Sequence, residues 1–212
     1  MKFSILSWGA WSPQYQQQAD WQAWPAAAEV DAASMAPKLP QVPAMQRRRL
    51  SKLTKIVLDS IFQSQPPSQC RSIFASQHGE INRTVKLLDD IVAQSELSPT
   101  AFSQSVHNTA SGIYSIVSKN QAASTSIAAD RETLSQACIE AYAQLCEDPA
   151  PILLSYADDT VPDIYKQFTC EPEWPIAIAF VLAPNQAKNT AVAHINIEAT
   201  QVSATQLALA EI

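Results

Sequence analysis

Apolar residues recur with two different periods along the chain, and the alternation between them predicts an α/β fold. Between residues 46 and 63, Leu50, Leu53, Val57 and Ile61 fall on one helical face. Further helices are predicted at 81–92, 102–118 and 131–146, with Ser98-Pro99 as a helix start before the second of these. Short apolar runs predict strands at 1–11, 71–76, 124–129, 152–156, 176–182 and 192–197. Strands separated by helices imply a sheet with helices packed on its faces.

Length and glycine content narrow the possible classes of protein. The 212 residues are compatible with a single domain spanning 1–212. Prolines break any helix between residues 25 and 43, which predicts an irregular surface excursion there. Only three glycines occur, and neither GxGxxG nor GxxxxGK[ST] is present, which argues against a phosphate-cradling nucleotide site. The net charge of −6 argues against a nucleic-acid partner.

The cysteines and the N-terminus predict a cytoplasmic protein. No apolar run approaches the roughly 18 residues of a membrane-spanning helix, so no membrane insertion is expected. The first eight residues contain too short an apolar core for a signal peptide. Cys138 and Cys146 would lie about 12 Å apart along one helix, too far to form a disulfide. We therefore expect free thiols, as in a reducing compartment.

Charge is distributed unevenly. Six basic residues and no acidic residue fall between positions 38 and 55: Lys38, Arg47, Arg48, Arg49, Lys52 and Lys55. Residues 130–173 instead hold ten acidic residues against Arg131 and Lys166. The basic run is either the solvated beginning of a helix or a docking site for an acidic partner, and nothing in the run separates the two interpretations.

Residue types alone predict no convincing active site. Ser105 and His107 are the best nucleophile and base in sequence proximity, but residues two apart on a helix do not face each other. We expect His107 to be structural, hydrogen-bonded near a helix boundary. The three histidines have no HxH or HxxxH spacing, so neither a metal ion nor another cofactor is predicted. The adjacent acids Asp89–Asp90 and Asp158–Asp159 are expected to be solvated.

Two segments carry a resemblance to a known family. They are IFASQHGE at 73–80 and LSPTAFSQSVHNTASG at 97–112, which contains the motif residues Ser105, His107 and Asn108. The chain resembles the N-terminal half of beta-ketoacyl synthases and, more closely, the short chain length factors of aryl-polyene-type clusters. The resemblance covers about residues 1–160 and is strongest between 73 and 145. It implies a truncated thiolase-like fold and leaves 161–212 as extra, unassigned strands.

The resemblance also implies a catalytically silent chain. In an active synthase of this family, a strand leads into a nucleophilic cysteine at a tight turn before a helix, where the helix N-terminus favours the thiolate. Aligning 124–129 with that strand puts the nucleophile position near Arg131, with Asp130 and Glu132 as the neighbouring candidates. None of these side chains forms a thioester, and Cys138 lies about two helical turns too late. The family's catalytic histidines belong to the C-terminal half, and His194 lacks their surrounding motif.

A silent homologue of this kind resembles, in function, a chain length factor. Such a subunit forms a heterodimer with a ketosynthase and closes its acyl tunnel, while the ketosynthase condenses malonyl units on an acyl carrier protein. The resemblance implies that the 124–129 strand pairs across the dimer axis, through Ser124, Thr125, Ser126, Ile127, Ala128 and Ala129. It implies tunnel side chains on one face of the preceding helix, at Phe102, Val106, Thr109 and Ile113. These four could instead fill the core of the chain itself.

Two other functions stay open at this point. One is an active acyltransferase or condensing enzyme that uses Ser105 with His107. The other is a scaffold that recruits an acyl carrier protein through Arg47, Arg48 and Arg49.

Overall fold

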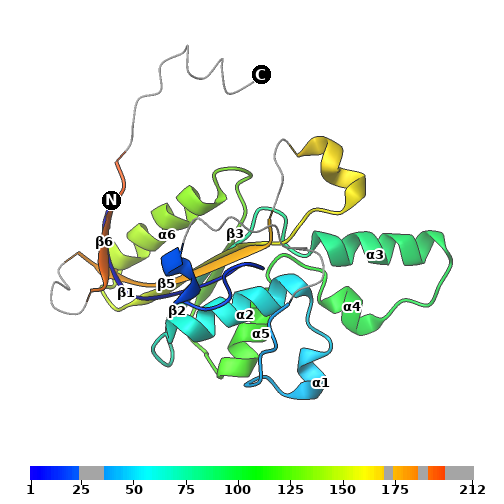
Figure 1. Ribbon diagram of the computed structural model, residues 1–212, viewed down its shortest axis with the longest axis horizontal. Coiled ribbons are helices and arrows are strands. Elements are labelled where there is room, and N and C mark those ends of the chain that lie inside the picture. Colours follow the sequence, from blue (N-terminus) through cyan, green and yellow to red (C-terminus); the bar gives the residue numbers. More distant parts are fainter. Residues whose placement is uncertain (24–35, 170–173, 186–190, 199–212) are drawn as a thin grey trace, which may run out of the picture.

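The described strands form one six-stranded sheet (Figure 1). The computed structural model describes residues 1–23, 36–169, 174–185 and 191–198. The strands are β1 (Lys2–Trp11), β2 (Arg71–Ala75), β3 (Ser124–Ile127), β4 (Ile152–Asp158), β5 (Ile176–Pro184) and β6 (Ala193–Asn196). The α-helices are α1 (Ala44–Arg47), α2 (Lys52–Ser64), α3 (Ile81–Val92), α4 (Pro99–Ser103), α5 (Thr109–Ser118) and α6 (Thr133–Glu147). Two 3-10 helices, η1 (Asp20–Ala23) and η2 (Asp163–Phe168), complete the described elements. All six predicted strands are confirmed, with ends that differ by a few residues.

The strand order is β3-β2-β4-β5-β1-β6. β2 pairs in parallel with both β3 and β4, whereas β5 runs antiparallel to β4 and β1, and β6 runs antiparallel to β1. The two strands that the sequence left unassigned, β5 and β6, therefore complete the sheet. Because β2, β3 and β4 are parallel, the loops at their carboxyl ends meet at one edge of the sheet, the usual place for a site in an α/β protein.

Helices cover both faces of the sheet. Figure 1 shows α2 and α5 on one side and α6 on the other. Ile56 and Ile61 of α2 share a buried core with Leu153 of β4, and Ala137 and Ala141 of α6 share a second core with strand residues of the opposite face. A Cβ on Gly9 would overlap the carbonyl oxygen of Ser60, so the absence of a side chain lets α2 lie directly against β1. The result is an α/β/α arrangement, as the apolar periods predict.

The predicted helix over 46–63 is wrong in its extent. The structure has α1, a break, and then α2 from Lys52. Ser51 ends the break as the N-cap of α2, because its side chain accepts a hydrogen bond from the Thr54 amide at 2.9 Å. The excursion before it is irregular over the described residues 36–43, but it is not confined to the surface, because Leu39 and Val42 are each only 1% exposed in the core beside α2.

The predicted helix over 102–118 is also wrong, since it is two helices. α4 ends at Ser103 and α5 begins at Thr109. Between them, Ser105 Oγ donates to the Phe102 carbonyl at 2.8 Å, and Thr109 Oγ1 donates to the Val106 carbonyl at 2.8 Å. Hydroxyl groups that bond nearby carbonyls compete with the helical ladder and accompany the break here. They are not sufficient for it, because Ser111 and Ser115 make similar bonds within α5.

Candidate functional site

The turn between β3 and α6 occupies the position where the resemblance places a nucleophile. Asp130 adopts a positive φ of 48° there, so the sharp turn is centred one residue before Arg131. Thr133, which is 1% exposed, closes the turn: its Oγ1 accepts from the Ala129 amide at 2.9 Å and donates to the Asp130 carbonyl at 2.6 Å. A tight turn before a helix therefore lies at the predicted position. Its three exposed side chains are two carboxylates and a guanidinium, Asp130, Glu132 and Arg131, and none can carry an acyl thioester.

The described thiols lie away from this turn, and two of them, Cys70 and Cys138, have a raised pKa. Cys138 is half-buried within α6, and burial raises its pKa above the ordinary value. Burial likewise raises the pKa of Cys70, whose Sγ donates to the Pro151 carbonyl at 3.3 Å. Cys146 is exposed near the far end of α6. A raised pKa keeps a thiol protonated at neutral pH, the opposite of a catalytic cysteine; Cys170 lies outside the described residues.

Ser105 and His107 do not form a catalytic pair. The Ser105 hydroxyl donates to the Phe102 carbonyl, whereas His107 Nε2 lies 2.8 Å from the carbonyl oxygen of Ser76. Because a carbonyl oxygen only accepts, Nε2 carries the proton and donates it. His107 precedes Asn108, the N-cap residue of α5, so the predicted structural hydrogen bond near a helix boundary is confirmed.

A buried aspartate holds the loop at the carboxyl end of β2. Asp158 is 8% exposed and accepts from Ser76 Oγ at 2.7 Å and from the amides of Gln77 and His78 at 3.0 and 3.1 Å. Gln77 Nε2 in turn donates to Asp130 Oδ1 at 2.8 Å. The expectation that Asp158 is solvated is therefore wrong. The network joins the ends of β2, β3 and β4 into one polar cluster, which fixes the turn at Asp130.

The four proposed tunnel residues do not share one helical face. Phe102 on α4 and Val106 in the following turn are 68% and 50% exposed, whereas Thr109 is buried and Ile113 packs against the core beside α2. The prediction of a single face fails because the helix is broken between residues 103 and 109. Only Phe102 and Val106 can meet another molecule.

These two residues belong to a larger apolar surface on α3, α4 and the connecting segments. Its members, all at least 42% exposed, are Leu88, Ile91, Val92, Leu97, Phe102 and Val106. α3 buries only Leu87 within this chain, although its apolar residues recur with helical spacing. The base of α3 is fixed: Glu80, 5% exposed, accepts from Ser51 Oγ at 2.7 Å and from Thr54 Oγ1 at 2.8 Å. Figure 1 shows α3 and α4 extending to one side of the sheet.

β3 is an edge strand. It pairs with β2 on one side, and its other side has no strand beside it among the described residues. Ala123 and Ile127 accept hydrogen bonds from β2 amides, at 3.1 Å each. Along a strand, the backbone amide and carbonyl groups of alternate residues point toward opposite neighbouring strands. Those of Ser124 and Ser126 therefore point away from β2. Ala128 and Ala129, predicted as strand, follow the end of β3 and belong to the approach to the turn.

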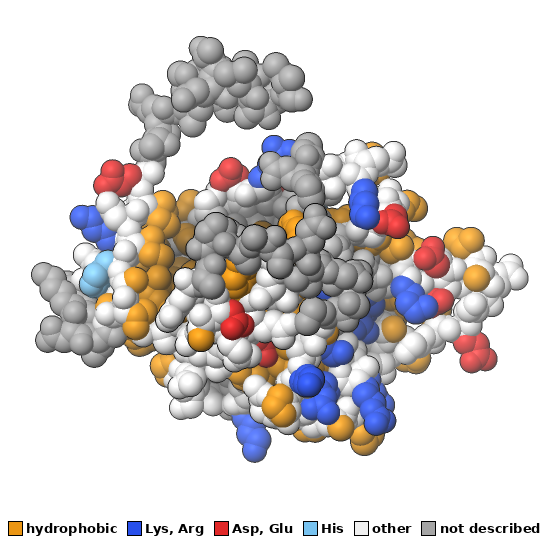
Figure 2. All heavy atoms as spheres, in the orientation of Figure 1, with side chains coloured by type: hydrophobic (Ala, Val, Ile, Leu, Met, Phe, Trp, Pro, Cys, Tyr) orange, Lys and Arg blue, Asp and Glu red, His pale blue; other side chains and the backbone are white. Residues whose placement is uncertain are grey.

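Part of the basic run is used internally. Arg47 Nη1 donates to the Leu39 carbonyl at 3.0 Å, and Lys52 Nζ lies 3.1 Å from Asp159 Oδ1. Arg48 and Arg49 are exposed. Figure 2 shows Lys and Arg side chains gathered around α1, so the run contributes a basic patch to the surface.

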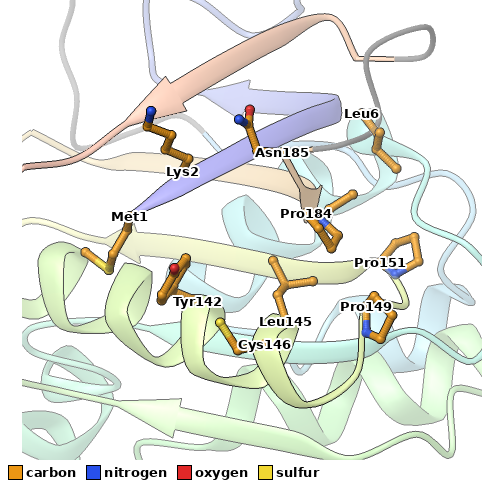
Figure 3. Close-up of a pocket in the computed structure, with 11 residues that line it drawn as sticks. Met1, Lys2, Leu6, Tyr142, Leu145, Cys146, Pro149, Pro151, Pro184 and Asn185 are labelled. Carbon is orange, nitrogen blue, oxygen red and sulfur yellow. The ribbon is translucent and has the colours of Figure 1, made fainter.

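A cavity of about 920 Å³ lies at the opposite end of α6 from the turn (Figure 3). Tyr142, Leu145 and Cys146 line it from the helix, and Pro151 and Pro184 line it from the chain beyond α6 and the end of β5. The 15-residue α6 is about 22 Å long, so this cavity lies at a distance from the turn at Asp130.

The described residues contain no group of histidine, cysteine, aspartate and glutamate side chains that could hold a metal ion. Among the same residues, no helix has both the length and the apolar character needed to span a membrane.

Comparisons with known proteins identify the family. No curated protein matches the chain by sequence. The family described as "Beta-ketoacyl synthase, N-terminal domain" matches residues 21–211. A chain from the ketosynthase ApeO in complex with its chain length factor ApeC, from Xenorhabdus doucetiae, is 26% identical with a TM-score of 0.78. That match covers 88% of this chain and 81% of the other.

Two further solved structures have the same fold at 13% identity. The ishigamide ketosynthase/chain length factor has a TM-score of 0.67, with 88% of this chain and 63% of that chain covered. The AntDE:AntF complex, a type II PKS acyl-carrier protein with its ketosynthase, has a TM-score of 0.60, with 87% and 64% covered. The chain thus spans less than two thirds of these two relatives.

The sheet and its helices are the N-terminal half of a thiolase-like ketosynthase fold. The chain belongs to the family of beta-ketoacyl synthase N-terminal domains.

Proposed function

We propose that this protein is a non-catalytic chain length factor, which forms a heterodimer with a ketosynthase in the cytoplasm and helps to shape its acyl tunnel. The observation that carries the proposal is the turn at Asp130, which keeps a strand–turn–helix geometry but presents Asp130, Arg131 and Glu132 in place of a nucleophile. Polyene chains grown on an acyl carrier protein, as in aryl polyene synthesis, are the substrate class that the resemblance favours.

The surface supports a partner of this kind. The outward groups of Ser124 and Ser126 leave β3 ready to accept another strand, and Phe102 and Val106 expose apolar side chains that a tunnel could use. The relative with 26% identity comes from a complex of a ketosynthase with its chain length factor. Together these features favour an assembly over an independently active chain.

The role of the β3 edge can be tested by co-expressing the chain with a ketosynthase of the same organism. In Ser126→Pro the outward amide is lost, while the hydrogen bonds from β3 to β2, made by the alternate residues, are retained. The matched control Ser126→Ala keeps the amide. Size-exclusion chromatography with mass detection would report the complex, and elongation of malonyl-carrier substrates would report its activity.

We expect a stoichiometric heterodimer that elongates for the natural sequence and for Ser126→Ala, and loss of the complex for Ser126→Pro with an unchanged circular dichroism spectrum. The isolated chain should be inert. A natural chain that ignores the ketosynthase, or that condenses malonyl units alone, would overturn the proposal.

The exposed arginines of the basic patch favour a second candidate function, recruitment of an acidic acyl carrier protein. Reversing Arg47, Arg48 and Arg49 to Glu should then abolish carrier binding and leave ketosynthase binding intact. Unchanged carrier binding in this variant would exclude the patch as a docking site.

A further inference from the structure

The sheet face beside α6 contains an apolar groove. Its volume is about 420 Å³, and it lies between α6 and the strands β1, β5 and β6. Leu134 and Cys138 line it from the helix, Phe180 from β5, and Ile195 and Ile197 from β6 and the residues that follow. The charged residues Arg131 and Glu132, which precede α6, border one end.

This face is less completely covered than the face beneath α2. Along β5, Ala177 and Ala179 face α2 and are fully buried, while Ile176, Ile178 and Phe180 alternate with them and are only half-buried. Trp8 on the neighbouring β1 is also half-buried and packs against the core beside α6. Large apolar side chains on a sheet are stabilised by removal from water, so this face favours a further covering layer.

The chain itself supplies an apolar segment at the rim of this groove. Ile197 is fixed to the sheet, because its amide donates to the Met1 carbonyl at 2.8 Å and its carbonyl accepts from the Met1 amino group at 2.6 Å. Residues 199–212 follow directly and lie outside the described part of the chain. Their sequence carries a single charged side chain, Glu211, and the apolar side chains Ala199, Val202, Ala204, Leu207, Ala208, Leu209, Ala210 and Ile212.

We propose that residues 199–212, the C-terminal segment, bind in the groove between α6 and β1, β5 and β6. Fourteen residues span up to about 46–50 Å when extended, so the segment can reach every part of the groove. A segment tethered at Ile197 has an effective concentration in the millimolar range or above, which favours it over a free apolar partner. The inference goes beyond the proposed function and does not depend on the β3 edge, although Arg131 and Glu132 of the turn after β3 border one end of the same groove.

Cys138 is a natural reporter for this groove, and Cys146, exposed elsewhere on α6, is an internal control. The experiment measures alkylation rates of both thiols by peptide mass spectrometry in the full chain. In the double variant Leu207→Asp/Leu209→Asp, we expect Cys138 to react at least about tenfold faster than in the natural sequence, with Cys146 unchanged. The matched control Thr205→Asp/Gln206→Asp adds the same charge at polar positions and should keep Cys138 protected.

The other possible occupants give different results. If the proposal is wrong because a second copy covers the groove, Cys138 protection will disappear on dilution to a monomer, as judged by mass detection. If a ketosynthase covers it, protection will arise only in the complex. The proposal would also be overturned if Cys138 reacted at the same rate in the natural sequence and in Leu207→Asp/Leu209→Asp. The same holds if the matched control accelerated the Cys138 reaction as much as that double variant does.

Discussion

His107 donates a hydrogen bond from Nε2 to the carbonyl oxygen of Ser76 at 2.8 Å, across 31 positions of the sequence. This bond ties the start of α5 to the loop after β2. Gly79 lies under the same imidazole, since a Cβ built on it would be 2.9 Å from His107 Cδ2. The histidine of the family motif therefore holds the loop after β2 in place.

The close contact at Gly79 predicts unequal effects of alanine at two glycines. Gly79 has a φ of +55° and no space for a Cβ, so Gly79→Ala should destabilise the protein by about 1–3 kcal/mol. Gly112 lies in α5 with open space around it, so Gly112→Ala should stabilise by about 0.5–1 kcal/mol. Urea denaturation followed by circular dichroism would measure both. Equal effects at the two positions would contradict the packing of His107 on Gly79.

Removal of the Ser105 hydroxyl should leave function unchanged. Ser105 Oγ bonds only the local Phe102 carbonyl among the contacts described, and it is not paired with His107. We expect Ser105→Ala to form the ketosynthase complex and to support elongation at the natural rate. A loss of condensation with the complex intact would instead favour the Ser105-dependent enzyme that the sequence left open.

The buried carboxylate of Asp158 should be important for stability. In Asp158→Asn one oxygen becomes an amide group that cannot accept from Ser76 or the loop amides, and hydrogen bonds to charged groups contribute about 1.5–3 kcal/mol each. We expect a loss of about 2 kcal/mol or more in the free energy of unfolding. The exposed Asp89 provides a matched control, and Asp89→Asn should change that free energy by less than about 0.5 kcal/mol. Similar losses in both variants would argue against the loop network.

The raised pKa of Cys138 predicts a specific pH dependence of alkylation. Since the thiolate is the reactive form, and burial raises the pKa above the ordinary value of 9.0, Cys138 should still gain reactivity as the pH rises past 9. At pH 7.5 the exposed Cys146 should react well before Cys138 and the buried Cys70. Mass spectrometry of the alkylated peptides would give each rate. A Cys138 rate that is already constant at neutral pH would reveal an activated thiol and contradict catalytic silence.

Most strands were predictable from sequence because they contain short apolar runs between turns, as in β5, whereas β3 has Ile127 as its one apolar residue. Helix boundaries were less predictable: α4 and α5 are separate helices, and the apolar spacing over 102–118 does not show the break between them. The turn was placed within one residue, but the positive φ belongs to Asp130 rather than Arg131. The burial of Asp158 depends on partners about 80 positions earlier, at Ser76 and Gln77, so no local pattern could reveal it.

The outward side of β3 has a consequence for protein quality in the cell. The backbone groups at an unpaired strand edge form hydrogen bonds with other extended chains, including another copy of the same protein. Copies synthesised in excess of the molecule that covers β3 would therefore be substrates for chaperones and proteases. The abundance of this protein should follow the supply of that molecule, so that stoichiometry is enforced by degradation of orphan subunits.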